Sequence, residues 1–560
     1  MIRWAQAVRG RDQIVFFAPT LEEAISEDHS VRLFDEVIGK LDFTEWEQSY
    51  ERVDGRPPIH PRVMAEVILY GLSLGIRSSR KLEDACINRL DFLWLTEGRS
   101  IDHSTLAGFR VRFAEKLKGM FRQIGRLAIG LGMVNLNQVA LDGTVKRANN
   151  SRYAVSREEN LEQKLAVLDQ QVESLINESL ATDRQEQELF GESSPTKLPR
   201  ELRDLKARQE RLAAALKKAR AMEARNKPRE QKPADEKPTD EKTADEERAD
   251  EKTADEKTAR ARGAVKSGGE SGGAEKAGDE KAGVAKAGPA VPTTDPDASL
   301  MKNKTGGFAP NYLVVLATEG NNGLIVDYQV PATSDEPSTV LPAMANLRES
   351  FGGDGDAGVV KELLADGGFN SGANLDALQT SGIQPWMAPK RSGNTGGGSA
   401  GKTLDKSRFA YDPASDLYRC PAGRSLPFWK NDSEKREGGV AKIRLYRSTD
   451  CGNCALASRC LSAQNKSKVR TIGRDQYEPL REQMAQRMNS DAGRDKYRRR
   501  SHLAETPFAV LNTSMNVIQL LLRGTAKVTA EVGWICSAYN LKKITRLLAA
   551  SRQPATTNTA

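Results

Sequence analysis

The sequence predicts an α/β fold, with a mixed sheet and flanking helices, that follows an all-α domain. Two apolar runs, 139–141 and 359–365, deliver Asp142 and Asp366, and a glycine follows each aspartate directly. Such runs are typical of buried strands that end at the carboxyl edge of an α/β sheet, where ligands bind. Strand-like and helix-like segments then alternate after residue 298, which favours an α/β sheet over an all-β fold.

The composition predicts several domains. The chain has 560 residues, too many for one compact core, and only 38% of them are hydrophobic. Lys and Arg number 84 against 76 Asp and Glu, a net charge of +8 that fits a polyanionic partner but also fits solubility alone. No apolar run is long enough for a signal peptide or a membrane span, so we expect a cytoplasmic protein without a membrane partner.

Residues 1–135 read as a domain of short helices. Pro61 suits the first turn of one helix, Gly75 breaks the pattern after it, and Asp102 can cap a later helix. Arg110 and Arg112 give that later helix a basic flank. The arrangement is typical of a helix-turn-helix-like DNA reader. An ordinary helical bundle with solvated arginines explains the same residues and is favoured by them alone.

The first part of the sheet is expected at 136–153, and two insertions follow it. Leucines recur at three- or four-residue steps over 154–225, which predicts an antiparallel helical hairpin or short coiled coil with its turn at 191–199. Its expected role is architectural or dimerising. Residues 226–297 hold ADEK-like repeats and no aromatic residue. Such a segment cannot bury enough apolar surface to fold, so we expect disorder.

The sheet is expected to continue over 298–390. Apolar and β-branched runs separated by turn residues predict strands, and longer amphipathic stretches predict helices. In order, these are strands at 311–318 and 324–330, a helix at 337–350, the strand ending at Asp366, a helix at 373–381 and a strand at 383–387.

Residues 391–470 are expected to be a linker followed by a cysteine-rich, zinc-ribbon-like module. Cys451 and Cys454 have the C-x-x-C spacing that offers two thiolates to a tetrahedral Zn²⁺, and Cys460 and Cys420 complete a four-thiolate set. Reduced, unliganded cysteines are the alternative. The other two cysteines lie in apolar helical surroundings and read as core residues.

Residues 471–550 read as helical, with an apolar stripe over 515–522, and 551–560 read as a disordered tail. Tyr497 and Glu505 share one helix face. Pro507 is expected to kink or end this helix just beyond the carboxylate. Basic residues suited to phosphate contact spread around the same helix. They are Lys496, Arg498, Arg499, Arg500 and His502.

Asp142, Asp366 and Glu505 can converge if the two strands are neighbours and the helix packs on the sheet. Converging carboxylates suit Mg²⁺, and a pair of such ions supports phosphodiester cleavage. The chain has 76 acidic residues, so the spacing also fits two turn-forming aspartates and a glutamate paired with an arginine.

Several segments outside the long insertion carry distinctive residue patterns in a fixed order. They are GRPPIHPRVMAEVILYG (55–71), GIRSSRKLE (75–83), IDHSTLAGFR (101–110), LDGT at Asp142, DPDASLM (295–301), LADGGFNS around Asp366, the cysteine segment, YRRRSHLAE ending at Glu505, and RGTAKVTAEVGWICSAYNLKKI (523–544). In this order the segments resemble DDE-class transposases of bacterial insertion sequences. Several ordered matches are more specific than any single one.

The resemblance implies an RNase H-like catalytic fold in which Asp142, Asp366 and Glu505 bind two Mg²⁺ ions. Tyr497 and Arg500 resemble the tyrosine and arginine that precede the family's glutamate. The implied reaction is hydrolytic nicking at transposon ends and attack of the freed 3′-hydroxyl on target DNA, without a covalent protein–DNA intermediate.

The resemblance also implies partners and a location. The N-terminal helices would bind the terminal inverted repeats, and the protein would act as a homo-oligomer, a dimer, in its DNA complex, associated with the nucleoid. The residues expected to contact DNA are Arg110, Arg112, Tyr497, Arg498, Arg499 and Arg500.

Two residues depart from the family's pattern. Phe369 stands where the family usually has a tyrosine, and Asn512 stands where it often has a lysine. The main alternative is therefore a catalytically inactive or repurposed DNA-binding protein that keeps the transposase fold, although all three carboxylates are present. A coiled-coil scaffold is a third possibility, but it accounts for 157–222 alone.

Overall fold

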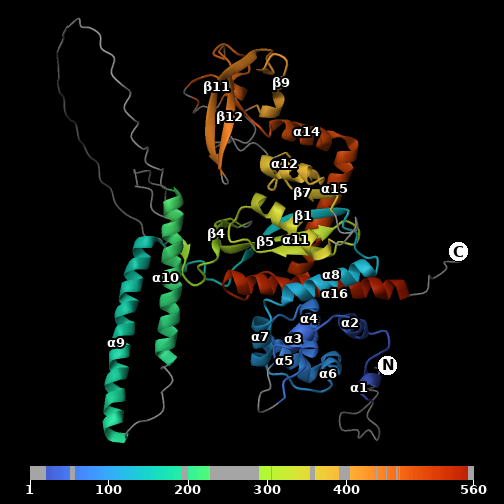
Figure 1. Ribbon diagram of the computed structural model, residues 1–560, viewed down its shortest axis with the longest axis vertical. Helices are drawn as coiled ribbons and strands as arrows, with labels where there is room; N and C mark the ends of the chain where they lie inside the picture. The colour runs from blue at the N-terminus through green and yellow to red at the C-terminus, as the bar shows by residue number, and fades with distance from the viewer. Residues whose placement is uncertain are drawn as a thin grey trace, which may run out of the picture. The chain divides into compact units, whose positions relative to one another are not determined.

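The chain divides into two units, Met1–Val155 with Pro292–Ala560, and Ser156–Val291. Figure 1 shows the computed structural model. It describes residues 20–50, 57–190, 200–226, 289–303, 306–352, 360–389, 404–436, 439–449, 451–461, 465 and 467–552. In this part of the chain, no helix combines the length and apolar character that crossing a membrane requires.

The N-terminal region is helical, as the sequence predicts. Pro61 opens α4, and the Asp102 carboxylate caps α7 by accepting the Ser104 and Thr105 N–H groups at 2.7 and 3.3 Å. Gly75 follows α4 at a φ of +81°, a left-handed conformation that glycine adopts without strain. The helices are α1 (Leu21–Ala24), α2 (Ser30–Ile38), α3 (Thr44–Glu47), α4 (Pro61–Ser73), α5 (Ser79–Asn88), α6 (Leu90–Thr96), α7 (His103–Arg112) and α8 (Leu117–Gly130).

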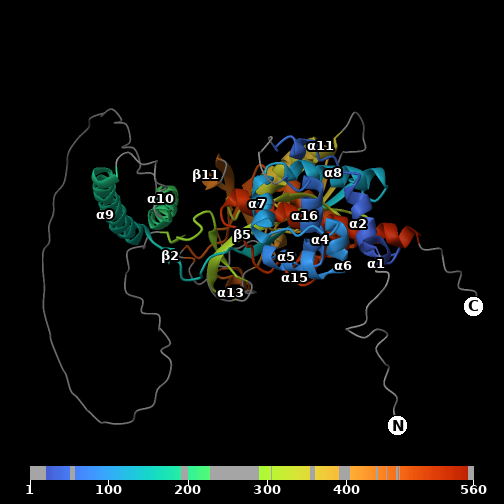
Figure 2. The same cartoon turned by 90° about the horizontal axis from the view of Figure 1, so that it is seen from below.

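An aromatic cluster joins these helices to the C-terminal helix α16 (Thr525–Arg552). Trp46 of α3 stacks on Phe113 with ring centroids 4.7 Å apart, and Trp534 of α16 meets Trp46 edge-on at 5.9 Å. Figure 2 shows α16 running beside α4 and α7, which it contacts. The first and last segments of this unit therefore share one core.

The central sheet is mixed, which confirms the predicted α/β class. Its order is β4-β5-β1-β7-β8, with β6 paired to β5. β1 runs parallel to β7, and β7 to β8, whereas the pairs β1–β5, β4–β5 and β5–β6 are antiparallel. The strands are β1 (Gln138–Arg147), β4 (Ser299–Lys302), β5 (Phe308–Glu319), β6 (Ile325–Gln329), β7 (Glu362–Ala365) and β8 (Gln384–Met387).

The expectation that the first strand ends at Asp142 is wrong. β1 continues to Arg147 because β5 pairs with it along its whole length, from Val139↔Glu319 to Arg147↔Asn311. Asp142 therefore lies within a strand, opposite Leu316. The pairing of β1 with β7 stops at Leu141, so Asp142 lies directly beyond the end of the β1–β7 ladder.

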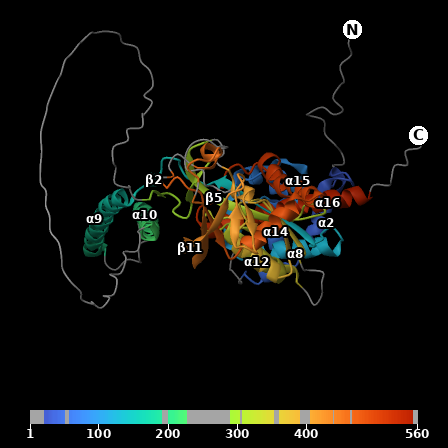
Figure 3. The ribbon, with the colours of Figure 1, turned by 90° about the horizontal axis from the view of Figure 1, so that it is seen from above.

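Helices cover the sheet. α15 packs on β1, β5, β7 and β8, and α14 packs on β8 and α12 (Figure 3).

Two short strands, β2 (Val155–Ser156) and β3 (Val291–Pro292), pair with each other. The remaining helices of this part are η1 (Pro337–Thr339), α11 (Val340–Phe351), α12 (Gly372–Thr380), α14 (Glu478–Asn489) and α15 (Asp491–Thr513).

Pro507 does not end the helix that carries Glu505. It is buried within α15, which runs on to Thr513, and residues on both sides of it, Leu503, Ala504, Phe508 and Leu511, are buried as well. The chain is then irregular over 514–524, with Asn516 at φ 54° and Gly524 at φ +83°. Ile518 is 62% exposed, so the apolar stripe expected at 515–522 is not one helical face.

The unit Ser156–Val291 contains a helical hairpin of α9 (Glu158–Phe190) and α10 (Arg200–Asn226). The helices are antiparallel, since Arg220 pairs with Glu158 at 3.0 Å and Gln209 donates to Asp169 at 2.5 Å. Apolar side chains of both helices close the seam, among them Leu161, Leu168, Leu212 and Leu216. The turn expected at 191–199 lies outside the described residues.

Most of the expected low-complexity segment, 227–288, also lies outside the described residues, as does 553–560 of the expected tail. The end of that segment is structured, contrary to the expectation of disorder up to 297. β3 lies there, and the buried Asp295 carboxylate accepts the Tyr312 hydroxyl at 2.9 Å. Partners elsewhere in the chain, rather than local composition, order these residues.

The cysteine-rich segment forms a second, antiparallel sheet of order β13-β12-β11-β10-β9. Its core contains Phe409, Tyr418, Leu426 and Tyr446. Residues 471–475, expected to be helical, form its strand β13 because β12 pairs with them. The elements are η3 (Lys406–Arg408), β9 (Ala410–Asp412), β10 (Leu417–Arg419), β11 (Ser425–Arg436), β12 (Gly439–Arg447), α13 (Ala457–Cys460) and β13 (Thr471–Asp475).

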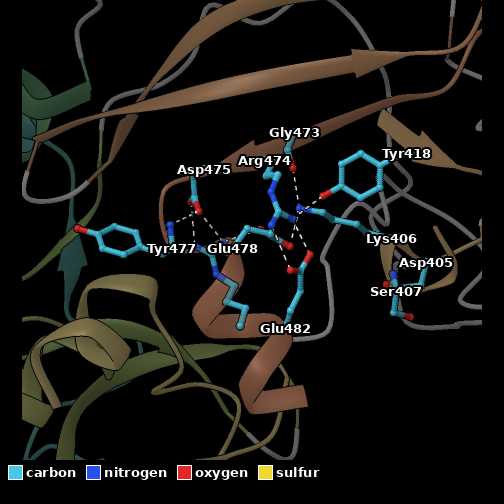
Figure 4. A network of polar contacts seen from close by, with 11 residues as sticks. Asp405, Lys406, Ser407, Tyr418, Gly473, Arg474, Asp475, Tyr477, Glu478 and Glu482 are labelled. Carbon is cyan, nitrogen blue, oxygen red and sulfur yellow. Dashed lines mark hydrogen bonds and ion pairs between the residues drawn. The ribbon is translucent and has the colours of Figure 1, made fainter. Parts of the chain in front are cut away.

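A network of ion pairs and hydrogen bonds joins this second sheet to α14 (Figure 4). Arg474 of β13 pairs with Glu482 at 2.5 Å, and the Asp475 carboxylate accepts two N–H groups of Arg481 at 2.8 Å. Lys406 pairs with Glu478 at 2.7 Å. Since α15 follows α14 directly, the network fixes the start of the helix that carries Glu505.

Candidate active site

Two parallel strands bring the predicted aspartates to one sheet edge. The last register pair of β1 and β7 is Leu141↔Ala365. Asp142 is the next residue of β1, and Asp366 is the first residue after β7. The three residues before each aspartate are apolar and fully buried: Val139, Ala140 and Leu141, and Leu363, Leu364 and Ala365, are all at 0% exposure, as expected for parallel strands covered on both faces. The backbone register therefore places the two carboxylates side by side.

Arg500 connects the first aspartate with the predicted glutamate. Its Nη1 lies 3.5 Å from Asp142 Oδ1, and its Nη2 lies 3.8 Å from Glu505 Oε1. The Arg500 side chain is 13% exposed and that of Glu505 is 61% exposed. Asp142 and Glu505 therefore face one guanidinium from two elements, with Glu505 on the open side.

Asp142 lies within the electrostatic influence of the other two carboxylates. Burial raises the pKa of Asp142 to about 6, Arg500 opposes this rise, and the charges of Asp366 and Glu505 add to it. The Asp366 carboxylate also accepts the Gly368 N–H at 2.7 Å, which closes the turn after β7. Mutual repulsion of this kind is what a bound cation offsets.

The basic residues of α15 divide into two groups. Tyr497 lies against Arg500, whose guanidinium carbon is 5.4 Å from its ring centroid, and burial raises the Tyr497 pKa. Lys496 pairs with Glu362. Arg498, in contrast, has an 81% exposed side chain, and Arg499 lines an open depression. Tyr497 and Arg500 thus belong to the carboxylate site, whereas Arg498 and Arg499 face outward.

Arg110 and Arg112 make contacts within the N-terminal domain, away from the carboxylates. The buried Arg110 guanidinium donates to the Arg77 carbonyl at 2.8 Å, and burial lowers its pKa to about 10. Arg112 donates to the Ser49 carbonyl at 2.5 Å and lies 4.3 Å from the centroid of the Tyr50 ring. Burial favours a structural role for Arg110, whereas Arg112 is exposed, and DNA contact by these arginines stays a prediction.

The four clustered cysteines line one small cavity in the second sheet module. Backbone N–H groups of Arg424 and Arg470 donate to the sulfurs of Cys420 and Cys451 at 3.3 and 3.5 Å. Within the described residues, only Glu83, Asp102 and His103 place three potential metal-ligand atoms within 4.8 Å of one another. The thiols therefore share a cavity without the spacing of a closed metal site.

Sequence reasoning missed a fourth carboxylate, Glu336, at the same sheet edge. A Cβ placed on Gly368 would lie 2.3 Å from Glu336 Oε2 and 2.8 Å from Asp366 Oδ1. A Cβ placed on Gly143 would lie 3.1 Å from Glu336 Oε1. The available signal was the pair of glycines beside the two aspartates, which can mark a close approach of another group.

The residue in place of the family's lysine also has a defined contact. The Asn512 side-chain oxygen accepts a hydrogen bond from Lys146, and the Lys146 ammonium donates to the Val517 carbonyl at 2.8 Å. Lys146 is buried, with 4% exposure, so it joins β1 to Asn512 of α15 and to Val517 after that helix, and it does not present a cation at the surface.

Two families match the chain. Residues 419–545 match the family described as "Transposase DDE domain", and residues 19–112 match the family described as "Transposase domain (DUF772)". The first match contains Glu505 but neither aspartate. No curated protein and no solved structure matches the chain. DDE transposases generally use a divalent metal and act on DNA. The chain therefore belongs to the transposases that carry a DDE domain, and it is a polynucleotidyl transferase.

Proposed function

We propose that this transposase binds the terminal inverted repeats of an insertion sequence and catalyses Mg²⁺-dependent strand cleavage followed by strand transfer from the 3′-hydroxyl. In this proposal Asp142, Asp366 and Glu505 are the catalytic carboxylates. The observation that carries it is the Leu141↔Ala365 register pair, directly after which both aspartates follow. Arg500 of α15 lies 3.5 Å from Asp142 and 3.8 Å from Glu505, which supports the third carboxylate.

The donor set fits a hard divalent cation. Mg²⁺ prefers carboxylate oxygens and keeps open positions for water and phosphate. Asp142 is partly buried and Glu505 is open to solvent, so the site offers protein oxygens on one side and access for DNA on the other. Mg²⁺ bound there would activate the attacking oxygen and stabilise the leaving oxygen of a phosphodiester. Two ions would suit the three carboxylates.

We also propose that the catalytic domain has the RNase H-like fold. The fold of the family supports this, as does a sheet in which three antiparallel strands, β6, β5 and β1, continue into β7 and β8 parallel to β1. In this proposal β1 and β7 carry the aspartates, and α15 lays the glutamate against the same edge.

DNA recognition is assigned to two regions. The helices α1–α8 would bind the inverted repeats, in a complex that contains two copies of the chain. Near the active site, the outward-facing Arg498 and Arg499 would contact phosphates, which are the main source of affinity in protein–DNA complexes. Tyr497 and Arg500 would instead position the carboxylates.

Structural zinc is proposed for Cys420, Cys451, Cys454 and Cys460. Four thiols around one cavity form a suitable donor set, and the sulfurs of Cys420 and Cys451 each accept a backbone N–H group. Bound zinc would bring the four sulfurs closer together and stabilise the second sheet module.

A cleavage assay tests the proposed reaction. A labelled duplex with the element's own end sequence is incubated with the full-length protein and Mg²⁺ or Ca²⁺. Nicking at the end should require Mg²⁺ and fall at least about 10³-fold, or about 4 kcal/mol in barrier height, in Asp142→Asn, Asp366→Asn and Glu505→Gln. DNA binding should persist.

Asp495→Asn is the matched control, because Asp495 is 72% exposed on the same helix as Glu505. It should nick like wild type. Nicking that survives all three active-site changes would mean that other carboxylates do the chemistry. Binding without nicking by the wild type would favour an inactive DNA-binding protein.

A further inference from the structure

The strand β11 contains one extra residue relative to its partner β12. Phe428 pairs with Tyr446 and Lys430 pairs with Leu445, so the register shifts between these pairs and Trp429 has no residue opposite it. A β-bulge of this kind redirects a side chain. The Trp429 side chain is 47% exposed. The bulge therefore presents a large aromatic ring at the surface of the second sheet, whose long strands β11 and β12 are visible in Figure 1.

Two cations lie against the Trp429 ring. The Lys430 Nζ atom is 4.8 Å from the ring centroid, and the guanidinium carbon of Arg447 is 4.6 Å from it. Lys430 follows the ring on β11, whereas Arg447 comes from the neighbouring strand β12. Such contacts hold the long side chains close to the ring and leave their positive charges in place.

The three side chains share the face of the sheet that is turned away from the core of the module. Tyr446 is buried in that core, and the adjacent Leu445 points to the opposite face, because side chains alternate along a strand. Lys430 is directly opposite Leu445, and Arg447 is two residues after it. Since the Trp429 ring contacts both cations, it lies on the same face.

Positive charge predominates on this face. The Asp432 carboxylate is only within 4.0 Å of Lys430 Nζ and is 51% exposed, so it compensates that ammonium weakly. The Asp475 carboxylate is buried and is paired with Arg481. Within the part of the chain that the structure describes, Arg447 has no ion-pair partner. A DNA strand offers what this face lacks, namely phosphates for the cations and flat groups for the ring.

From this arrangement we propose that Trp429, Lys430 and Arg447 form a DNA-contact surface on the second sheet module. The two cations bind phosphates of one strand, and a nucleotide of that strand packs on the ring. The inference rests on the proposed function, since it takes DNA as the partner, and it adds a third contact region to α1–α8 and α15. Arg474 and Arg481 join the module to α14, so DNA bound here is anchored to the catalytic domain.

The salt dependence of DNA binding tests the inference. Affinity of the full-length protein for the end duplex is measured by fluorescence anisotropy at several salt concentrations. Lys430→Ala and Arg447→Ala should each make the plot of log K against log salt shallower by about 0.9. Trp429→Ala should weaken binding at least about 5-fold at every salt concentration with an unchanged slope, and Trp429→Phe should keep most of the affinity.

Arg220→Ala is the matched control for the loss of a surface charge, because Arg220 is 58% exposed on α10, outside the three contact regions. Its affinity and slope should equal those of wild type. Unchanged affinity in Trp429→Ala, Lys430→Ala and Arg447→Ala would overturn the inference. The melting temperature of Trp429→Ala should stay at the wild-type value, since the ring is half-exposed. A lower melting temperature, with equal loss of affinity in Trp429→Phe, would assign the ring a structural role and also overturn it.

The wild type separates this inference from the proposed function. If the wild type binds and nicks the end duplex and the three variants bind it equally well, only the inference fails. If the wild type does not bind the end duplex, both fail together. Weaker self-association of DNA-free Trp429→Ala, with unchanged DNA affinity, would assign the surface to a contact between copies of the chain and overturn the inference.

Discussion

Leu141 of β1 and Ala365 of β7 form the last pair of a parallel ladder, and the two aspartates follow directly. Their proximity is thus set by the backbone register of the two strands. A slip of one residue would turn one of the two side chains to the other face of the sheet. The buried apolar runs that precede both aspartates hold the register, which links the core of the fold to the geometry of the site.

Arg500 should stabilise the metal-free protein. Arg500→Ala removes the only guanidinium that the described residues place beside both Asp142 and Glu505. The free energy of unfolding in EDTA should fall by about 1–3 kcal/mol, and added Mn²⁺ should raise the melting temperature more than in wild type, because the cation then offsets more repulsion. Thermal melts with and without Mn²⁺ measure both effects.

The matched control is Arg498→Ala on the same helix, since Arg498 is 81% exposed. An exposed ion pair contributes little, so its melting temperature should not change. Equal Mn²⁺ responses in wild type and Arg500→Ala would show that Arg500 does not compensate the carboxylates.

Arg498 and Arg499 should contribute to DNA affinity through phosphate contacts. Each change to Ala should make the plot of log K against log salt shallower by about 0.9 per lost phosphate contact. Fluorescence anisotropy with the end duplex at several salt concentrations measures this slope. Arg112→Ala should leave the slope unchanged but lower stability by about 1 kcal/mol, because it loses the Ser49 and Tyr50 contacts. A shallower salt slope in Arg112→Ala, with no change in Arg498→Ala and Arg499→Ala, would indicate instead that the N-terminal helices make the phosphate contacts.

Local patterns predicted the elements better than their ends. The helix caps, the apolar strands and the leucine seam depend on neighbours within a few residues, and the structure contains them. The extension of β1 to Arg147 depends on β5, about 170 residues away in the chain. The burial of Arg110 depends on contacts that α7 makes with distant segments. Such non-local partners leave no periodic signal.

The residues of the candidate site also divide into those that a local sequence pattern predicts and those that depend on distant segments. Asp142 and Asp366 end apolar runs, which is a local signal, and Glu505 lies in a segment that resembles the family. Glu336 has neither, since its neighbours Asp335 and Pro337 read as ordinary turn residues. Its approach to Gly143 and Gly368 exists only once the sheet and the turn are assembled.

The cysteine module should lose stability with its metal. We expect about one zinc ion per chain by mass spectrometry and a lower melting temperature after treatment with a strong zinc chelator. Cys454→Ser should abolish zinc binding. Cys86→Ala should retain it, because Cys86 lies buried in α5. A metal-free protein of unchanged stability would favour reduced, unliganded thiols.

Gly533 should be required for the packing of α16. A Cβ there would lie 2.4 Å from the Tyr328 hydroxyl oxygen and 2.8 Å from Leu117 Cδ2. Gly533→Ala should therefore destabilise the protein by about 1–3 kcal/mol in urea unfolding. Gly108→Ala, within α7 and with no atom near the new methyl group, should stabilise it by about 0.5–1 kcal/mol. Equal effects of the two changes would contradict the close approach of α16 to β6.

Glu66 should make the stability of the N-terminal domain depend on pH. It is buried in α4 with 3% exposure, and burial together with the nearby Asp35 raises its pKa from 4.5 to about 8. The folded protein then keeps a proton that the unfolded chain releases above pH 4.5. Stability should therefore fall as the pH rises from about 4.5 to 8.

Glu66→Gln removes this titration and should raise the free energy of unfolding by about 2–4 kcal/mol at pH 8 relative to its effect at pH 5. Urea unfolding at both pH values measures the difference. Glu115→Gln is the control, since Glu115 is exposed, and its effect should be the same at both pH values. If Glu66→Gln is equally destabilising at pH 5 and pH 8, Glu66 is ionised in the folded protein and is held by Arg62, which lies on the same helix.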